Sequence, residues 1–383
     1  MNRLKIAQAL CEKQCNVDFI CILDENQQLE ETIHDVNIIR IDGDHKRKGY
    51  FKLLNNYVVF TIRAFFKIHN LNRTKKYDYF HIHAPPDFLT VVAIPFRLIY
   101  GSRIILDLHD MLPEAVESNL QFKGSSIFVQ LANMIEKSAI RFSDAIIATN
   151  SFDKQIISSR NNVDPDKIFV VMNTPNLKQY TVETAAKEDY GYENKFIILF
   201  QGTIWKRRGI QTIIDSVDLL KDKIPICLLI VGDGPFLQDL KDIVNNKDLN
   251  DLVKFTGWVD LETLSRHISI ADVCIIPFLR TKVNERGVPN KLFEYAIHEK
   301  PIIASRLKGL ALTFSEKEIL FYEPGNADDL AKKILWCFDN PEEAEKMTIS
   351  TKRRYEEDYS WGKMEKELLK SYDSFGKCSS DRI

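Results

Sequence analysis

The sequence predicts an α/β protein built from two Rossmann-like domains that face each other across a cleft. Two series of short, β-branched apolar runs, each alternating with helical stretches, predict two parallel doubly wound sheets. Between the two series, residues 176–194 are polar and acidic, follow Pro175 and contain Gly191, which is typical of a domain linker. The length of 383 residues is enough for two domains of ordinary size.

The first half of the chain carries the first strand–helix series. It begins with apolar residues in helical spacing over residues 3–13. The β-branched runs predict strands at 17–23, 36–41, 79–83, 103–108, 144–149 and 167–172. Helical spacing predicts helices at 50–69, 89–100 and 127–141. We therefore assign residues 1–175 to an N-terminal domain.

The second half of the chain repeats this alternation. Strands are expected at 196–200, 226–231, 253–256, 273–276 and 301–304, and helices at 210–220 and 236–245. This series gives a second domain over residues 195–355. The tail, residues 356–383, has one apolar face between Trp361 and Tyr372, so we expect a C-terminal helix there.

Composition excludes several classes of protein. The hydrophobic share of 45% and the charged share of 28% are those of a globular protein, and a net charge of −2 provides no global field for nucleic acid. The seven cysteines form no CxxC pair, which argues against a disulfide framework or a zinc site and favours the cytoplasm. We find no signal peptide and no apolar run of the roughly 18 residues that a membrane span needs.

The most informative segment is residues 284–305. A Gly287-Val288-Pro289-Asn290 loop leads into an apolar helix that carries Lys291 and one acid, Glu294. A loop that enters a helix offers backbone N–H groups and a positive dipole end to an anion. A carboxylate in that helix can accept hydrogen bonds from a vicinal diol. Diphosphate at the loop and ribose at Glu294 describe a nucleotide-sugar, whereas an ordinary βα unit explains the helix and strand alone.

The run Pro289-Asn290-Lys291-Leu292-Phe293-Glu294-Tyr295 resembles the donor site of retaining glycosyltransferases with the two-Rossmann-domain (GT-B) architecture, family 4. The resemblance covers nearly the whole chain. It implies transfer of a hexosyl group from a nucleoside diphosphate sugar by front-face displacement, without a metal or another cofactor. It also implies a glycan or lipid-linked acceptor, a role in cell-surface polysaccharide synthesis, and a last helix that crosses back to the first domain.

A basic turn follows the first strand of the second domain. Gly202 permits a sharp turn at the strand end, and Lys206, Arg207 and Arg208 place three cations before a helix start. The resemblance makes Arg208 the diphosphate-binding cation and Gly202 the matching glycine. Thr203 stands where the family has Arg, which shifts the positive charge to the Lys206–Arg208 cluster. The alternative is a solvated basic turn.

A second glycine turn follows the strand expected at 226–231. Gly232-Asp233-Gly234-Pro235 joins a strand end to a helix whose first position is a proline. It resembles the turn that lies near the donor nucleotide in the same family. The motif is weak alone, and its position between the other two donor segments supports Gly232 and Gly234 as donor-site residues.

The first domain supplies the acceptor-side candidates. His83 and Asp87 follow one expected strand, and His109 and Asp110 follow another, at the edge where parallel sheets bind ligands. An imidazole can donate to a sugar hydroxyl or to a phosphate oxygen. These segments resemble the acceptor-side signature of the family, with His109 as a catalytic residue. The alternative is that each His is satisfied within its own turn.

One departure from the family concerns catalysis. Arg286 stands where most members have an acid, eight residues before Glu294. Contacts to the donor sugar would then come from Glu285 or from the backbone N–H groups of Gly287 and Val288. We list Glu285 with Arg208 and His109 as catalytic candidates.

A second departure concerns the start of the chain. A doubly wound domain normally begins with an apolar strand and a glycine turn, but this chain has no glycine before Gly43 and opens in a helix. The resemblance suggests that the first strand lies upstream of Met1 or does not exist. A catalytically silent sugar-nucleotide-binding subunit or a truncated transferase is the alternative function. A nucleotide-sugar 2-epimerase is less favoured, because the second domain has only His267 and His298 as further histidines.

Residues 46–76 are basic and aromatic. They contain nine Lys or Arg and no acid, interleaved with large apolar residues. Such a helix is typical of a membrane-surface element on the inner face of a membrane, and it suits a lipid-linked acceptor. The alternative is a domain helix that packs its apolar stripe on its own sheet.

Overall fold

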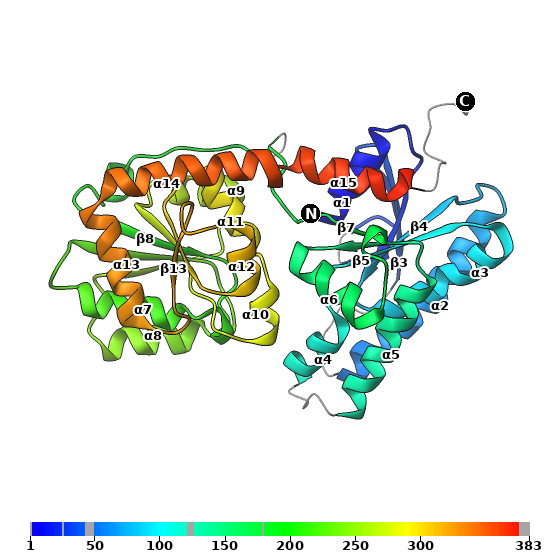
Figure 1. Ribbon diagram of the computed structural model, residues 1–383, viewed down its shortest axis with the longest axis horizontal. Helices are drawn as coiled ribbons and strands as arrows, with labels where there is room; N and C mark the ends of the chain where they lie inside the picture. Colours follow the sequence, from blue (N-terminus) through cyan, green and yellow to red (C-terminus); the bar gives the residue numbers. More distant parts are fainter. Residues whose placement is uncertain (1, 25–26, 43–49, 121–125, 178–179, 375–383) are drawn as a thin grey trace. The chain divides into compact units, whose positions relative to one another are not determined.

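The computed structural model describes residues 2–24, 27–42, 50–120, 126–177 and 180–374 (Figure 1). The expected membrane-contacting residues Lys46, Arg47 and Lys48 lie outside this described part. The chain forms two compact units, one of Met1–Asn173 with Met364–Ile383 and the other of Thr174–Lys363.

Unit 2 is built on a six-stranded parallel sheet with the order β10-β9-β8-β11-β12-β13. Its β-branched, apolar strands are buried on both faces, as expected for a parallel sheet covered by helices. The strands are β8 (Phe196–Gln201), β9 (Ile226–Val231), β10 (Val253–Gly257), β11 (Val273–Ile276), β12 (Ile302–Ser305) and β13 (Leu320–Tyr322).

Helices surround this sheet. On one side, α7, α8 and α13 pack around a core that includes Ile198, Ile213 and Leu228 (Figure 1). The helices of unit 2 are α7 (Ile210–Leu220), α8 (Leu237–Asn246), α9 (Leu261–Ser269), α10 (Lys282–Arg286), α11 (Asn290–Ile297), α12 (Lys308–Thr313), α13 (Ala327–Asp339) and α14 (Pro341–Arg354), with short turns η3 (Lys187–Tyr190), η4 (Lys206–Arg208) and η5 (Tyr355–Tyr359).

Unit 1 contains two sheets instead of the single doubly wound sheet that we expected. One is parallel, with the order β4-β5-β6-β7, and the other has the order β1-β3-β2 with β2 antiparallel to β3. The strands are β1 (Asp18–Ile22), β2 (Glu30–Ile33), β3 (Val36–Ile41), β4 (Tyr79–Ala84), β5 (Arg103–Leu108), β6 (Ala145–Ala148) and β7 (Ile168–Val170).

The two sheets of unit 1 meet through side chains. Lys75 Nζ donates to Asp18 at 2.7 Å, and Ile20 packs against the core around Phe80. β1 and β4 are edge strands of the two sheets and do not pair with each other. The described residues contain no strand that pairs with both.

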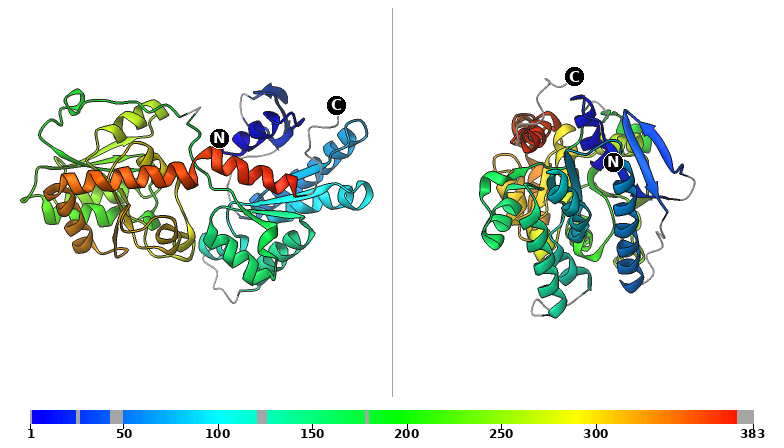
Figure 2. Two further views of the ribbon diagram at one scale, coloured as in Figure 1. Left: turned by 45° about the horizontal axis from the view of Figure 1, so that its top comes forward. Right: turned by 90° about the vertical axis from the view of Figure 1, so that its right-hand side faces the viewer.

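Helices complete unit 1. Helix α2 packs beside β3, and α2 and α3 run side by side (Figure 2). The helices are α1 (Asn2–Cys11), α2 (Tyr50–Asn72), α3 (Thr90–Tyr100), α4 (Leu112–Leu120), α5 (Ile127–Phe142) and α6 (Ser151–Asn161), with short turns η1 (Asp87–Leu89) and η2 (Pro165–Lys167).

Two expected boundaries need correction. Residues 176–194 are not a free linker, because their backbone N–H groups bind helix α9: Glu183 N donates to Ser265 Oγ at 2.8 Å and Ala185 N to Ser269 Oγ at 2.9 Å. The last helix, α15 (Trp361–Asp373), begins at Trp361 instead of residue 356, since the preceding residues form the π-helical turn η5. From Met364 onward this helix belongs to unit 1.

Candidate active site

The predicted donor residues meet where strand β8 ends against helix α11. Three side chains of α11 bind Gln201, the last residue of β8. Tyr295 Oη accepts from Gln201 N at 3.2 Å, Glu294 Oε2 accepts from Gln201 Nε2, and Lys291 Nζ donates to the Gln201 carbonyl. Helix α11 is held in place because Leu292, Phe293 and its other apolar residues are buried. The strand end and the helix therefore form one preorganised unit.

Two cations converge beside this strand end. Lys291 Nζ lies 5.5 Å from the Phe278 ring centroid, and the Arg208 guanidinium carbon lies 4.3 Å from the same centroid. Burial, and then the charge of Arg208, lower the pKa of Lys291 well below its usual range, although Glu294 opposes this shift. Lys291 forms no ion pair with a carboxylate of the described residues. An anion bound between Lys291 and Arg208 would relieve the repulsion between them.

Glu294 lies one turn after Lys291 and is partly buried. Burial raises its pKa, while the hydrogen bond from Gln201 and the charge of Lys291 partly offset the rise. Gln201 was missed by the sequence analysis. Its Oε1 atom is buried and has no hydrogen-bond partner among the described residues, so the amide holds Glu294 with its nitrogen and keeps an acceptor free.

The glycines that were predicted for the donor site have a packing role. Gly202 has φ of 120°, and a Cβ atom there would lie 3.0 Å from Lys291 Nζ. A Cβ atom on Gly232 would lie 2.2 Å from the Gly202 carbonyl oxygen, and one on Gly234 would lie 2.4 Å from that of Ile204. Gly232 and Gly234 therefore let the second turn support the first. The structure explains both glycines without a ligand.

The loop before α11 differs in part from our expectation. The N–H of Gly287 donates to the carbonyls of Val283 and Asn284, both at 3.2 Å, because it closes the last turn of α10. Gly287 N–H is therefore not available to phosphate, which corrects the prediction. The N–H of Val288 has no acceptor within the described chain. Helix α11 begins at Asn290 without a side-chain cap, and Leu292 N donates to the Pro289 carbonyl at 3.0 Å, so the N–H groups of Asn290 and Lys291 are the ones open to an anion.

Glu285 is engaged in structural contacts. It forms an ion pair with Arg280 and accepts from Lys308 N, at the start of α12, at 3.1 Å. The neighbouring Asn284 is buried and donates to the carbonyls of Arg207 and Leu279, both at 2.8 Å. Asn284 thus ties the basic turn η4 to α10, a role that needs the three-dimensional contact to be seen. Within η4, Lys206 is exposed and Arg208 is partly buried.

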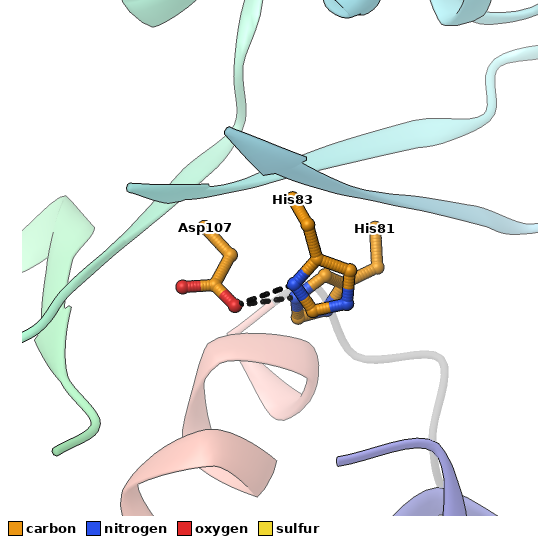
Figure 3. A group of neighbouring side chains, drawn as sticks. All are labelled: His81, His83 and Asp107. Carbon is orange, nitrogen blue, oxygen red and sulfur yellow. Dashed lines mark hydrogen bonds and ion pairs between the residues drawn. The ribbon is translucent and has the colours of Figure 1, made fainter. Parts of the chain in front are cut away.

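Three histidines gather around Asp107 in unit 1, and Figure 3 shows two of them, His81 and His83, with that acid. The register of β4 and β5 pairs His83 with Asp107, and His83 Nδ1 lies 2.8 Å from Asp107 Oδ2. His81 Nε2 and His109 Nε2 lie 3.4 Å and 3.1 Å from the same oxygen. Burial alone would raise the pKa of Asp107, but hydrogen bonds from His109, His81 and His83 outweigh it and hold that pKa well below its usual range. Burial also lowers the pKa of His83 to about 4, so this ring is neutral at physiological pH.

The remaining acceptor-side candidates lie in different surroundings. Asp110 is exposed beside His109. Asp87 is fully buried in η1, and neither of its carboxylate oxygens has a hydrogen-bond partner within the described chain. Asp87 therefore cannot contact an acceptor in this structure, which corrects the prediction. Its position just after a strand suggested exposure, but η1 turns the side chain inward. His81 and Asp107 were missed as site residues, because their contacts join two strands that are distant in sequence.

Helix α2, the described part of the predicted membrane segment, has two apolar faces. Ile68 packs into a core with Phe80 and Phe96. A second stripe with a spacing of four residues, Val58, Ile62 and Phe66, is exposed. The segment contains no acid of its own, but acids elsewhere in the chain compensate part of its charge. Acids outside the segment bind its cations through three pairs, Arg63–Asp42, Lys67–Glu30 and Lys75–Asp18.

Two further helices of unit 1 also expose large apolar side chains. Helix α3 packs against both α2 and α5. The large apolar residues exposed on α3 and α5 are Val91, Leu98, Ile99, Tyr100, Ile127, Phe128, Leu131, Met134 and Phe142. Within the described residues, no helix combines the length and apolarity needed to cross a bilayer.

Each half of the chain matches a known family of glycosyltransferases. Residues 4–178 match the family model described as Glycosyltransferase Family 4, and residues 195–340 match the model described as Glycosyl transferases group 1. Alpha-D-kanosaminyltransferase of Streptomyces kanamyceticus is 20% identical over 310 residues, which cover 78% of each chain. The lipopolysaccharide core biosynthesis glycosyltransferase LpsD of Rhizobium meliloti is 28% identical over 154 residues, 40% of this chain and 42% of LpsD.

A solved structure agrees with this assignment. The crystal structure of Anabaena HepE in complex with UDP superposes with a TM-score of 0.70 at 15% identity, covering 89% of this chain and 87% of HepE. The fold class that we predicted, an α/β protein with Rossmann-like domains, is confirmed. The chain is a glycosyltransferase of the GT-B type.

Proposed function

We propose that the protein is a retaining glycosyltransferase that moves a hexosyl group from a nucleoside diphosphate sugar to a glycan or lipid-linked acceptor. The observation that carries this proposal is the convergence of Lys291 and Arg208 at the end of β8, with Glu294 one turn further along α11. The two cations suit a diphosphate, and the acid suits the ribose diol. The UDP bound to the structural relative HepE supports the same ligand class.

In this proposal the cations act on the leaving group. As the bond between the anomeric carbon and the diphosphate oxygen breaks, negative charge grows on that oxygen. Arg208, Lys291, the N–H of Val288 and the uncapped start of α11 stabilise it. The acceptor hydroxyl attacks from the same face and passes its proton to the departing diphosphate, so configuration is retained. Lys206, which is exposed, contributes a longer-range positive charge.

We further propose that no divalent metal bridges the diphosphate. Arg208 and Lys291 already supply two positive charges at the position where a metal would act. Carboxylates are the oxygen ligands that Mg²⁺ prefers, and within the described residues no cluster of three metal-ligating side chains lies at the predicted donor residues. Glu294 is occupied by Gln201, and Glu285 is occupied by Arg280 and Lys308.

The acceptor side of the proposal rests on His109, with His83 and Asp110 beside it. Asp107 engages Nε2 of His109, which fixes the ring and leaves Nδ1 to contact a sugar hydroxyl. The name of the relative LpsD supports a role in cell-surface polysaccharide synthesis. The matches to two glycosyltransferase family models support a carbohydrate acceptor.

A lipid-linked acceptor is supported by the surface of unit 1. Besides the exposed stripe of Val58, Ile62 and Phe66 on α2, helix α3 beside it and helix α5 beside α3 expose large apolar residues, and Arg141 on α5 is an exposed cation. Apolar side chains interspersed with cations are typical of a surface that lies on an anionic membrane. We propose that this surface seats unit 1 on the membrane that holds the acceptor.

A catalytically silent sugar-nucleotide-binding subunit is the second candidate. It is favoured by one observation: Arg286 replaces the usual acid, and the adjacent Glu285 is tied to Arg280 and α12. Incubation of the protein with radiolabelled UDP- and GDP-sugars and a bacterial lipid extract separates the two. Transfer to the extract, with NMR showing the donor's anomeric configuration in the product, supports the transferase. Binding of donor without transfer or hydrolysis supports the silent subunit.

A further inference from the structure

The histidine cluster of unit 1 has a geometry that its hydrogen bonds do not fully explain. Strands β4 and β5 are parallel, and their register places His83 opposite Asp107 and His81 two pairs earlier, opposite Ile105. His81 and His83 lie two residues apart, so they project from the same face of β4. Ile82, between them, packs on the opposite side against the apolar core. The fold itself therefore brings the two imidazoles to one carboxylate (Figure 3).

Three atoms of this cluster form a nearly equilateral triangle. His83 Nδ1, His109 Nε2 and Asp107 Oδ2 are separated by 2.8, 3.1 and 3.2 Å. His83 Nδ1 and His109 Nε2 can each carry one proton, and each proton makes one hydrogen bond. Hydrogen bonds therefore explain at most two of the three short distances. Ligand atoms around tetrahedral zinc lie about 3.3 Å apart, given bonds of about 2.0–2.1 Å. Asp107 Oδ2 also lies 3.4 Å from His81 Nε2, so the distances of this oxygen from His83 Nδ1 and His81 Nε2, 2.8 and 3.4 Å, are close to those of a metal ligand set.

The chemistry and surroundings of these groups fit a metal ion of intermediate softness. Imidazole nitrogen with one carboxylate oxygen is a common ligand set for zinc and related ions. One ligand atom from each of His81, His83 and Asp107 lies within 4.8 Å of the other two. The side chains of His81 and His83 retain 12% and 14% exposure, so an ion can reach them.

An outer partner also orients His81. Tyr372 Oη, on helix α15, lies 2.7 Å from His81 Nδ1, which turns Nε2 towards Asp107. Histidines that bind metal usually donate their second ring nitrogen to such a partner. Tyr372 packs edge-on against Tyr79 at a centroid distance of 5.1 Å, so its position is fixed independently of His81.

We propose that unit 1 binds one divalent transition-metal ion of the zinc class through His81 Nε2, His83 Nδ1 and Asp107 Oδ2. His109 borders the remaining coordination position. This site is separate from the donor residues, all of which lie in unit 2. Its role is to hold β4, β5 and the end of α15 together and to fix the ring of His109.

The test uses the full chain after removal of metal by a chelator. Calorimetric titration with zinc chloride is expected to show one ion per chain, and His81→Gln and His83→Gln are each expected to weaken binding at least tenfold. His69→Gln, an exposed histidine on α2, serves as the matched control and should bind zinc like the wild type. Tyr372→Phe keeps the ring but removes the hydroxyl, and should weaken binding roughly tenfold.

Cobalt gives a second readout that does not depend on activity. Cobalt(II) bound by imidazole and carboxylate shows visible d–d bands without a sulfur charge-transfer band, and these should disappear in His83→Gln. Zinc binding that is equally weak in the wild type and in both histidine variants would overturn the proposal. A thiolate charge-transfer band would also overturn it, because the metal would then lie on a cysteine such as Cys11 or Cys21.

Discussion

Lys291 reaches from helix α11 to strand β8, where its Nζ lies 4.0 Å from the centroid of the Phe200 ring. The ammonium group thus rests on an aromatic face and a carbonyl, with a second cation, Arg208, nearby. A buried lysine in such surroundings is costly to keep charged. We interpret this cost as preparation for an anion, which would stabilise the charged form.

This relationship predicts that donor binding is linked to proton uptake. Burial and Arg208 lower the pKa of Lys291, so part of the free protein carries a neutral Lys291 at alkaline pH. A bound diphosphate favours the charged form and raises that pKa. Binding should therefore take up protons at alkaline pH and weaken as pH rises between the two pKa values.

Calorimetry of UDP binding in buffers of different ionisation enthalpy measures this uptake. The Lys291→Met variant removes the charge but keeps most of the side-chain volume, and it should show no uptake. Lys332→Met, at an exposed position on α13, is the control and should behave like the wild type. Equal proton uptake in wild type and Lys291→Met would refute the role of Lys291.

Transfer should need no added magnesium or manganese. Two side-chain cations stand where a bridging metal would otherwise neutralise the diphosphate. The initial rate is compared in buffer with EDTA and in buffer with magnesium or manganese. A rate that EDTA abolishes and magnesium or manganese restores contradicts the proposal. Restoration by zinc alone would instead point to the histidine cluster of unit 1.

Asp87 should limit stability at neutral pH. Burial, and then the charge of Glu136, raise its pKa from 3.8 to about 7. The folded protein thus holds this proton more tightly than the unfolded chain. The contribution of Asp87 to the free energy of unfolding is largest below the unfolded pKa and is lost as pH rises to about 7.

The Asp87→Asn variant should not lose free energy of unfolding as pH rises to about 7, because the amide stays neutral. The shift of about 3 pKa units, at about 1.4 kcal/mol each, sets an upper limit of roughly 4 kcal/mol on the gain above pH 7. Urea unfolding at several pH values measures it, with the exposed Asp166→Asn as control. A gain that does not shrink as pH falls towards 4 would show that titration of Asp87 is not its cause.

Unit 1 should bind anionic vesicles through the apolar stripe of α2. Because Arg63, Lys67 and Lys75 are paired with acids, we expect the apolar side chains to carry much of the affinity. The double variant Ile62→Ser/Phe66→Ser should lose cosedimentation with anionic vesicles. Ile349→Ser, at an exposed apolar position of unit 2, should not.

The basic end of the segment provides a second arm of this test. Replacement of Lys46, Arg47, Lys48 and Lys52 by Gln should weaken binding at low salt and have less effect at high salt, where charges are screened. If vesicle binding is absent at both salt concentrations, or survives both sets of substitutions, α2 serves only to pack on its own sheet.

The sequence predicted much of the fold because local patterns determine it. Strands β9 and β11 were placed at their observed bounds, since each is a continuous apolar run that parallel pairing buries on both faces. Helix α9 was missed because its apolar residues are few. The division of unit 1 into two sheets could not be predicted, because pairing depends on contacts distant in sequence.

The candidate site was predicted where its residues lie within one motif. Lys291 and Glu294 share one helix, and their spacing alone places them on adjacent turns. Gln201, Asn284 and Asp107 could not be found in this way, because each acts on a group that the fold brings from another element. Glu285 and Asp87 were predicted as site residues from their positions in the sequence. The sequence could not show that Glu285 forms an ion pair with Arg280 or that Asp87 is fully buried.

The central claim is that the end of β8 and helix α11 bind a nucleoside diphosphate. Glu294→Ala and Arg208→Ala should each weaken its binding by at least about 1.5 kcal/mol, the scale of a charged hydrogen bond. Glu343→Ala and Lys332→Ala, at exposed positions of α14 and α13, are the matched controls and should leave affinity unchanged.

Calorimetry with UDP and with GDP is the most direct measurement of this claim, with circular dichroism to verify folding. We predict that at least one of the two nucleotides binds the wild type, and that its affinity falls at least tenfold in both Glu294→Ala and Arg208→Ala but in neither control. Unchanged affinity for that nucleotide in both folded variants would contradict the account.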